Sequence, residues 1–227
     1  MLNWHEEAKK QWDDFAEKWS ENARDMWENG SRKSILPFFT EALKEGAKVC
    51  DLGCGDGYAT MKLAQMGFDA IGVDLSEEMI ESAKQKLHDS QSVQFIQADL
   101  SNLPFSDGEY DAIMAINSIE WTENPLHTLH EIKRIVKPNG VACFGILGPT
   151  AGPRQAHSYK RLYGENVIMN SMQAWEFERL ALENGWELLK DQGVEKKEAK
   201  LSKLSHLPKE LQQAVSFMWL FLLRKKA

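Results

Sequence analysis

Short apolar segments recur along the middle of the chain, separated by segments in which apolar residues return every three or four positions. The short segments predict strands over residues 48–51, 70–74, 92–98, 110–116 and 141–147. The periodic segments predict helices over residues 58–65, 76–88 and 124–136. Strands and helices that alternate in this way build a parallel sheet with helices on both faces. The pattern therefore predicts an α/β fold with a doubly wound, mostly parallel sheet.

The first 45 residues precede this alternation and place aromatic side chains among many charges. Trp12, Phe15 and Trp19 share one face of a helix, and a second helix is expected over residues 31–44. The aromatic face either packs onto the domain or covers a ligand pocket as a lid. We interpret this region as a lid, with Trp19 facing a bound acceptor molecule.

The pattern after residue 150 is less regular. Residues 152–169 are polar and are expected to lack regular structure, and residues 217–224 are apolar enough for either a strand or a continued helix. The other predicted elements are a helix over 171–184, a strand over 186–194, a solvated connector over 195–203 and a helix over 208–215.

Charge and cysteine usage restrict the location and partners of the protein. A formal net charge of −7 and a pI near 5.5 argue against nucleic acid, whose phosphates require a basic face. Cys50, Cys54 and Cys143 form no CxxC pair, which favours reduced thiols, no metal site and a cytoplasmic location. The N-terminus is acidic and the apolar run 217–223 is short, so we expect neither secretion nor a membrane partner.

A glycine-rich turn is predicted where the first strand of the sheet ends. Asp51 closes the strand, and Gly53, Gly55 and Gly57 follow at every second position. Glycine lets bare backbone approach a ligand closely. The turn therefore predicts a ligand site at the carboxyl edge of the sheet.

Acidic residues end the next two strands at the same predicted edge. Asp74 follows the second strand, where a carboxylate accepts hydrogen bonds from both hydroxyls of a ribose. Asp99 follows the third strand, where it would accept from the amino group of an adenine. Asp111 lies near the start of the fourth strand, at the opposite edge, and is expected to be structural.

The spacing of the glycines separates the classes of nucleotide site. A dinucleotide fingerprint requires glycine or alanine where Tyr58 stands, and a Walker loop requires a Gly-Lys-Ser/Thr ending that this turn lacks. A dinucleotide-dependent oxidoreductase is therefore the less favoured interpretation.

Taken together, these segments resemble the class I S-adenosylmethionine-dependent methyltransferases, and among them the methyltransferase type 11 group. The resemblance covers residues 48–147 and implies a seven-stranded sheet of Rossmann-like type whose last two strands include an antiparallel one. It favours a strand over 217–224. The motifs that carry it are Val-Cys-Asp-Leu-Gly-Cys-Gly-Asp-Gly (49–57), Gly-Val-Asp-Leu-Ser (72–76), Gln-Ala-Asp-Leu (97–100), Leu-Pro-Phe (103–105), Tyr-Asp-Ala-Ile (110–113) and Ile-Lys-Arg-Ile-Val-Lys-Pro-Asn-Gly (132–140).

The resemblance implies S-adenosylmethionine as the cofactor, S-adenosylhomocysteine as its product, and a role for each matched position. The glycine turn would line the methionine moiety, Asp74 the ribose, and Asp99 the adenine amino group. The implied cofactor-binding residues are Asp51, Gly53, Cys54, Gly55, Gly57, Asp74, Leu75, Asp99, Leu100 and Asn117. It further implies one domain over residues 1–227, with a helical lid (1–45), a cofactor-binding core (46–150) and substrate-side and C-terminal elements (151–227).

The chain departs from many relatives after the fourth strand, where Glu120 and Trp121 stand in place of a histidine pair. A carboxylate beside an indole would suit a cationic or amine acceptor. Alternatively, Glu120 caps the next helix and Trp121 packs. Arg32 and Tyr159 are further candidates for contact with the acceptor. No residue stands out as a general base, so alignment of donor and acceptor is the expected catalytic device.

The sequence thus predicts an enzyme that methylates a small molecule and acts as a monomer or homodimer. A second interpretation is a regulatory protein that binds S-adenosylmethionine and transfers no methyl group.

Overall fold

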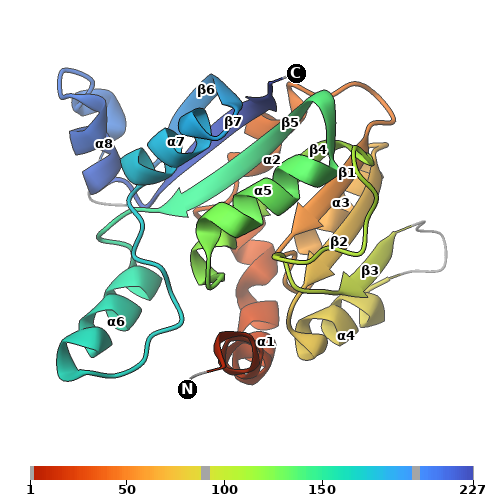
Figure 1. The fold of residues 1–227 in the computed structure, drawn as a ribbon, viewed down its shortest axis with the longest axis horizontal. Coiled ribbons are helices and arrows are strands. Elements are labelled where there is room, and N and C mark those ends of the chain that lie inside the picture. Colours follow the sequence, from red (N-terminus) through yellow and green to blue (C-terminus); the bar gives the residue numbers. More distant parts are fainter. Residues whose placement is uncertain (1–2, 88–92, 196–199, 227) are drawn as a thin grey trace.

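A seven-stranded sheet forms the centre of the computed structural model, which describes residues 3–87, 93–195 and 200–226 (Figure 1). The strand order is β3-β2-β1-β4-β5-β7-β6. β1 to β5 run parallel, and β7 is antiparallel to both of its neighbours. The strands are β1 (Lys48–Leu52), β2 (Asp69–Asp74), β3 (Gln94–Gln97), β4 (Tyr110–Ile116), β5 (Val136–Leu147), β6 (Trp186–Val194) and β7 (Met218–Lys225). The predicted fold class is confirmed, and the apolar segment predicted as a strand over 217–224 forms β7, one residue further along the chain.

Helices cover both faces of the sheet, and each face has its own apolar core. α5 and α7 pack on one face around Phe144, Phe177 and Trp186, whereas α2 and α3 pack on the other around Phe39 and Leu63. The helices are α1 (Trp4–Glu28), α2 (Ile35–Thr40), α3 (Tyr58–Gln65), α4 (Glu77–Gln85), α5 (Pro125–Ile135), α6 (Gly152–Lys160), α7 (Ala174–Glu183) and α8 (Lys209–Val215), with 3₁₀ turns η1 (Ile119–Trp121), η2 (Arg161–Tyr163) and η3 (Leu201–Lys203). Among these helices, none is long and apolar enough to cross a membrane.

Side-chain caps fix the starts of the two helices that follow β2 and β4. The Ser76 hydroxyl accepts from the Met79 backbone N–H at 3.1 Å, as its position before an acidic first turn predicts. Asn124 caps α5 by accepting from the His127 N–H at 3.0 Å. α4 ends at Gln85, and the predicted helix end near residue 88 and strand start at residue 92 lie outside the described residues.

The fifth strand begins earlier than the sequence predicts. The pattern places a turn at residues 137–140 and a strand from Val141, but β5 starts at Val136. Tyr110 pairs with Val136 and Ala112 with Val141, so the extra residues bulge out of the ladder. Asn139 adopts a φ of 63°, which asparagine tolerates better than most residues. The turn residues predicted over 137–140 therefore interrupt a strand rather than preceding one.

The prediction of irregular structure over residues 152–169 is wrong at its start, where α6 and η2 form. Pro153 occupies the first turn of α6, where a missing N–H costs nothing. The buried Arg154 guanidinium donates to the carbonyls of Leu147 (2.8 Å) and Met172 (2.7 Å) and so ties the helix to β5. Because both carbonyls belong to residues outside the helix, the polar sequence of the segment does not predict these contacts. The helix predicted over 31–44 is also shorter, since α2 ends at Thr40.

α1 lies against α4 and α3 on the carboxyl side of the sheet (Figure 1). Its alanines Ala8, Ala16 and Ala23 are buried, which allows the helix to approach the domain closely. Asp13 accepts from the Ser76 hydroxyl at 2.6 Å, and the Tyr58 hydroxyl donates to Glu28 at 2.5 Å. These two hydrogen bonds therefore hold α1 to the core near its middle and at its C-terminal end.

Candidate functional site

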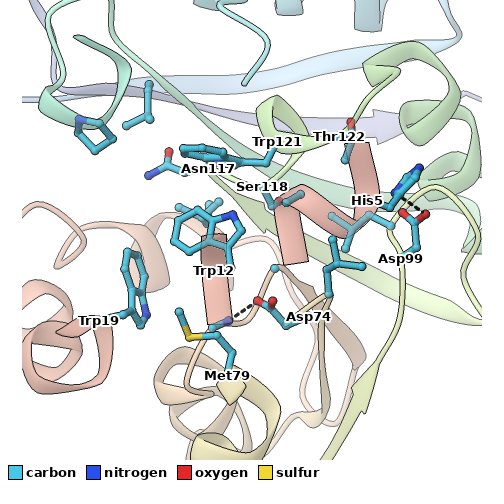
Figure 2. Close-up of a pocket in the computed structure, with 18 of the residues that line it drawn as sticks. His5, Trp12, Trp19, Asp74, Met79, Asp99, Asn117, Ser118, Trp121 and Thr122 are labelled. Atoms are coloured by element: carbon cyan, nitrogen blue, oxygen red, sulfur yellow. Dashed lines mark hydrogen bonds and ion pairs between the residues drawn. The ribbon is translucent and has the colours of Figure 1, made fainter. Parts of the chain in front are cut away.

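A cavity opens at the carboxyl edge of the sheet, beneath α1 (Figure 2). The space between its walls, counted together with its open mouth, is about 870 Å³. β1, β2, β3, β4 and β5 all contribute at or just beyond their carboxyl ends, and α1 supplies the cover. The lining comprises Trp4, His5, Ala8, Trp12, Trp19, Arg32, Gly53, Gly55, Asp74, Leu75, Met79, Asp99, Leu100, Ile116, Asn117, Ser118, Trp121, Thr122, Leu147 and Pro153.

The glycine turn between β1 and α3 forms part of this lining because side chains would not fit there. Gly53 and Gly55 have φ angles of 75° and 55°. A Cβ on Gly53 would lie 2.5 Å from the Ser118 Cβ, and one on Gly55 would lie 2.8 Å from the Trp19 indole nitrogen. Both the left-handed backbone and the close neighbours therefore require glycine.

Asp74 sits at the end of β2 with its carboxylate joined to the glycine turn. One oxygen accepts from the Gly55 N–H at 2.8 Å and the other from the Ser76 N–H at 3.0 Å (Figure 2). Burial raises the pKa of this carboxyl above its usual value, and the backbone hydrogen bonds oppose that rise. Each oxygen keeps a lone pair that a ligand hydroxyl can use.

Asp99, at the next strand end, is paired with a residue of α1. His5 Nδ1 lies 2.9 Å from one Asp99 oxygen, and the Ser101 N–H donates to the other at 2.8 Å (Figure 2). His5 Nε2 also lies 3.7 Å from Glu123. The cover helix therefore contacts the carboxylate predicted to bind adenine, a contact for which the sequence carries no signal.

Arg32 is a buried cation in the wall of the cavity. Its guanidinium lies 4.8 Å from the Trp19 ring centre and 5.4 Å from that of Trp27. The Asn117 amide satisfies its hydrogen bonds when its oxygen accepts from Arg32 Nη2 at 3.2 Å and its nitrogen donates to the Gly145 carbonyl at 3.1 Å. Burial lowers the pKa of Arg32 to about 10, so the side chain stays charged at neutral pH.

Three indoles meet where the cavity passes from the strand ends toward α6. The Trp12 ring centre lies 6.0 Å from that of Trp19 and 4.9 Å from that of Trp121, with the rings nearly perpendicular. Figure 2 shows Trp12 between the other two. Trp4 fixes the arrangement further by donating its indole N–H to the Trp121 carbonyl at 2.7 Å. The aromatic face of the first helix was apparent from the sequence, but its meeting with Trp121 was not.

The cavity brings together most, but not all, of the residues predicted to contact ligands. Gly53, Gly55, Asp74, Leu75, Asp99, Leu100 and Asn117 of the cofactor set line it, as do Trp19, Arg32 and Trp121 of the acceptor set. Asp51, Cys54 and Gly57 are buried outside this lining, and Asp51 accepts from the Thr60 hydroxyl at 2.7 Å.

Glu120 and Tyr159 also lie outside the lining. Glu120 is fully buried and accepts from the Leu147 N–H at 2.8 Å, so neither a free acceptor contact nor the expected helix cap describes it. Within the described residues its second oxygen has no hydrogen-bond partner. Tyr159 is 58% exposed, and its hydroxyl lies 2.9 Å from that of Tyr163.

Comparison with known proteins assigns the core of the chain to a family. Residues 50–144 match the family model described as "Methyltransferase domain". The chain is 34% identical over 109 residues to the putative methyltransferase YqeM of Bacillus subtilis, and 36% identical over 112 residues to the demethylmenaquinone methyltransferase of Staphylococcus saprophyticus. These alignments cover 46% and 48% of this chain, and the chain spans only 44% and 48% of the two relatives.

A solved structure shares the fold over almost the whole chain. It is the complex between the Haloferax volcanii Trm112 methyltransferase activator and the putative methyltransferase, with a TM-score of 0.76, 20% identity, and coverage of 97% of this chain and 98% of that one. The sheet order, with a cavity at the carboxyl edge of the strands, is that of a Rossmann-like fold. Residues 50–144 are therefore similar to methyltransferase domains, and the described chain shares the fold of the neighbouring structure.

Proposed function

We propose that this protein transfers a methyl group from S-adenosylmethionine to a small-molecule acceptor. One observation carries the proposal: the glycine turn, Asp74 and Asp99 leave three adjacent parallel strands and line a single cavity. A turn that exposes backbone, beside two carboxylates in register, suits a nucleoside whose ribose hydroxyls and base amino group are hydrogen-bond donors.

The residues present fit the donor molecule. Gly53 and Gly55 leave room for the chain that bears the sulfur, Asp74 would accept from the ribose hydroxyls, and Asp99 from the adenine amino group. Arg32 offers a charge for the donor carboxylate. The donor supplies an activated methyl group on a positively charged sulfur.

Alignment and exclusion of water are the contributions of the protein to the reaction. Trp12, Trp19 and Trp121 wall off the space between the glycine turn and the mouth of the cavity. His5 is paired with Asp99, and both carboxylates of the described lining already accept hydrogen bonds. The catalytic device is therefore positioning of the acceptor in a dry, aromatic chamber rather than proton transfer by a lining side chain.

The donor assignment is tested by replacing Asp74. We expect Asp74→Ala to weaken S-adenosylhomocysteine binding by about 1–3 kcal/mol, because ligand hydroxyls lose their acceptor. Isothermal titration calorimetry measures the change. Asp69→Ala is the matched control, since Asp69 begins the same strand at the opposite edge of the sheet and is exposed. Equal affinity of wild type and Asp74→Ala would remove Asp74 from the site.

A second prediction concerns Arg32. Among the described residues its only hydrogen-bond acceptor is the Asn117 amide, which leaves most of its donors for a carboxylate. We expect Arg32→Gln to weaken the binding of S-adenosylhomocysteine by roughly 1–3 kcal/mol. Binding of 5′-methylthioadenosine, which lacks the amino-acid end, should change much less. Parallel losses for the two ligands would mean that Arg32 only supports the wall of the cavity.

Methyl transfer in solution distinguishes the proposed enzyme from a regulatory protein that only binds the donor. Transfer of a labelled methyl group from S-adenosylmethionine to a component of a metabolite extract is the expected result. A protein that binds S-adenosylhomocysteine and labels nothing across broad extracts would be the donor-binding regulatory protein. A thermal midpoint raised by NADH and unmoved by S-adenosylhomocysteine would instead favour an oxidoreductase.

A further inference from the structure

Three large apolar side chains are exposed close together at the end of α6 and in η2. Tyr159, Leu162 and Tyr163 are 58%, 74% and 70% exposed. Their spacing of three and four residues places them on one side of the turn, and the two tyrosine rings lie 5.4 Å apart. We call these three residues, with the neighbouring exposed Lys160 and Arg161, the α6–η2 face.

The charge of this face differs in sign from that of the molecule. Residues 152–163 contain Arg154, Lys160 and Arg161 and no acidic residue, although the whole chain carries a net charge of −7. Arg154 is buried and donates to backbone carbonyls, so the exposed positive charge belongs to Lys160 and Arg161. A partner for this face would therefore combine apolar and anionic groups.

The helix that carries this face begins at the cavity. Pro153, in the first turn of α6, lines the cavity, and the His157 ring lies 4.8 Å from that of Trp121. The lining contributed by β4, β5 and α6 at this end is largely apolar, with Ile116, Leu147 and Pro153. Figure 1 shows α6 standing away from the sheet, below β5 and β7. α6 therefore connects the wall of the cavity, at Pro153, with the α6–η2 face at its other end.

We propose that the α6–η2 face docks on an anionic lipid bilayer and that the acceptor enters the cavity from that surface. Tyrosine and leucine side chains partition into the interfacial region of a bilayer, while lysine and arginine remain with anionic headgroups. The proposal extends the proposed function by giving the acceptor an apolar body. It replaces the expectation, based on the sequence, of no membrane partner.

The small extent of the face favours a bilayer over an acidic protein. A stable protein interface buries about 800 Å² on each side and involves on the order of 20 residues. The exposed large apolar residues of this region are three side chains within five positions of the described chain. A bilayer requires no complementary protein surface, and a few apolar anchors beside basic residues bind it weakly and reversibly.

Vesicle co-sedimentation tests the proposal directly. We expect the full chain to sediment with vesicles of phosphatidylglycerol and phosphatidylcholine and to stay in solution with phosphatidylcholine alone. Leu162→Glu should reduce the bound fraction by about tenfold, and the double change Lys160→Glu with Arg161→Glu by more than about tenfold. Raising the salt to about 0.5 M should release the wild type.

The matched control is Leu211→Glu on α8, where another exposed leucine (51%) lies on a different element. It should sediment like the wild type. Absence of sedimentation with anionic vesicles, equal binding to neutral vesicles, or equal losses from Leu162→Glu and Leu211→Glu would overturn the proposal. S-adenosylhomocysteine binding, measured on the same samples, shows that each variant is folded and tests the donor site independently of the membrane.

Discussion

A Glu120→Gln variant is expected to lose less stability than the wild type when the pH rises from about 5 to about 8. Burial raises the pKa of Glu120 to about 7, so the folded protein holds a proton that the unfolded chain releases near pH 4.5. A raised pKa contributes stability below the unfolded value, and that stability is lost as the pH rises through 7. Over this pH range the free energy of unfolding should fall by about 2–3 kcal/mol more for the wild type than for the variant.

Urea denaturation at both pH values measures the difference in the free energy of unfolding. Glutamine keeps an oxygen that can accept from the Leu147 N–H, so the substitution removes the titration and preserves the contact. The variant should still lose some stability as the pH rises, because burial also raises the pKa of Asp51 to about 7 and the variant keeps that residue. Glu187→Gln, at an exposed position of β6, is the control. Identical pH profiles for the wild type and Glu120→Gln would contradict the prediction.

Gly57→Ala is expected to destabilise the fold by about 3 kcal/mol. Gly57 has a φ of 76°, and an added Cβ would lie 2.4 Å from the Phe95 ring and 2.9 Å from the Ala83 Cβ. The left-handed backbone costs roughly 1–2 kcal/mol for alanine. Crowding a packed core adds typically 1–3 kcal/mol. Because Phe95 and Ala83 are both buried, neither has space to move aside.

Gly164→Ala separates the two contributions. Gly164 has a similar φ of 74°, but an added Cβ would meet no atom within 4 Å. The Gly164→Ala variant should lose only the cost of the left-handed backbone, about 1–2 kcal/mol in the free energy of unfolding. A Gly57→Ala loss no larger than that of Gly164→Ala would show that the contact with Phe95 and Ala83 does not constrain position 57.

The central sheet could be predicted because its signals are local. Each of the first five strands is a short apolar run, and turn or capping residues such as Gly46 and Ser76 mark where elements begin and end. The errors fall where distant contacts outweigh the local pattern. The polar segment of α6 becomes helical while Arg154 reaches the carbonyls of Leu147 and Met172. The turn chemistry near Asn139 is absorbed into β5 because that strand pairs with β4 on both sides of the bulge.

The same contrast between local signals and distant contacts applies to the candidate site. Asp74 and Asp99 could be placed in one cavity from the sequence, because parallel strands end at a common edge. The position of the Glu120 side chain could not be predicted, because its carboxylate accepts from the N–H of Leu147 on another element of the fold. The pairing of His5 with Asp99 joins the start of α1 to the loop after β3, and no spacing rule connects the two residues.

The sequence by itself determined the α/β fold, the glycine turn and the row of carboxylates beside it, because strand periodicity and glycine's backbone freedom act within a few residues. Only the tertiary structure decided how the cavity is closed. α1 is set across the strand ends by its buried alanines and by the bonds of Asp13 and Glu28 to the core. That placement brings Trp12 against Trp121, more than a hundred positions away in the chain. Such contacts depend on packing between whole elements, which local periodicity does not specify.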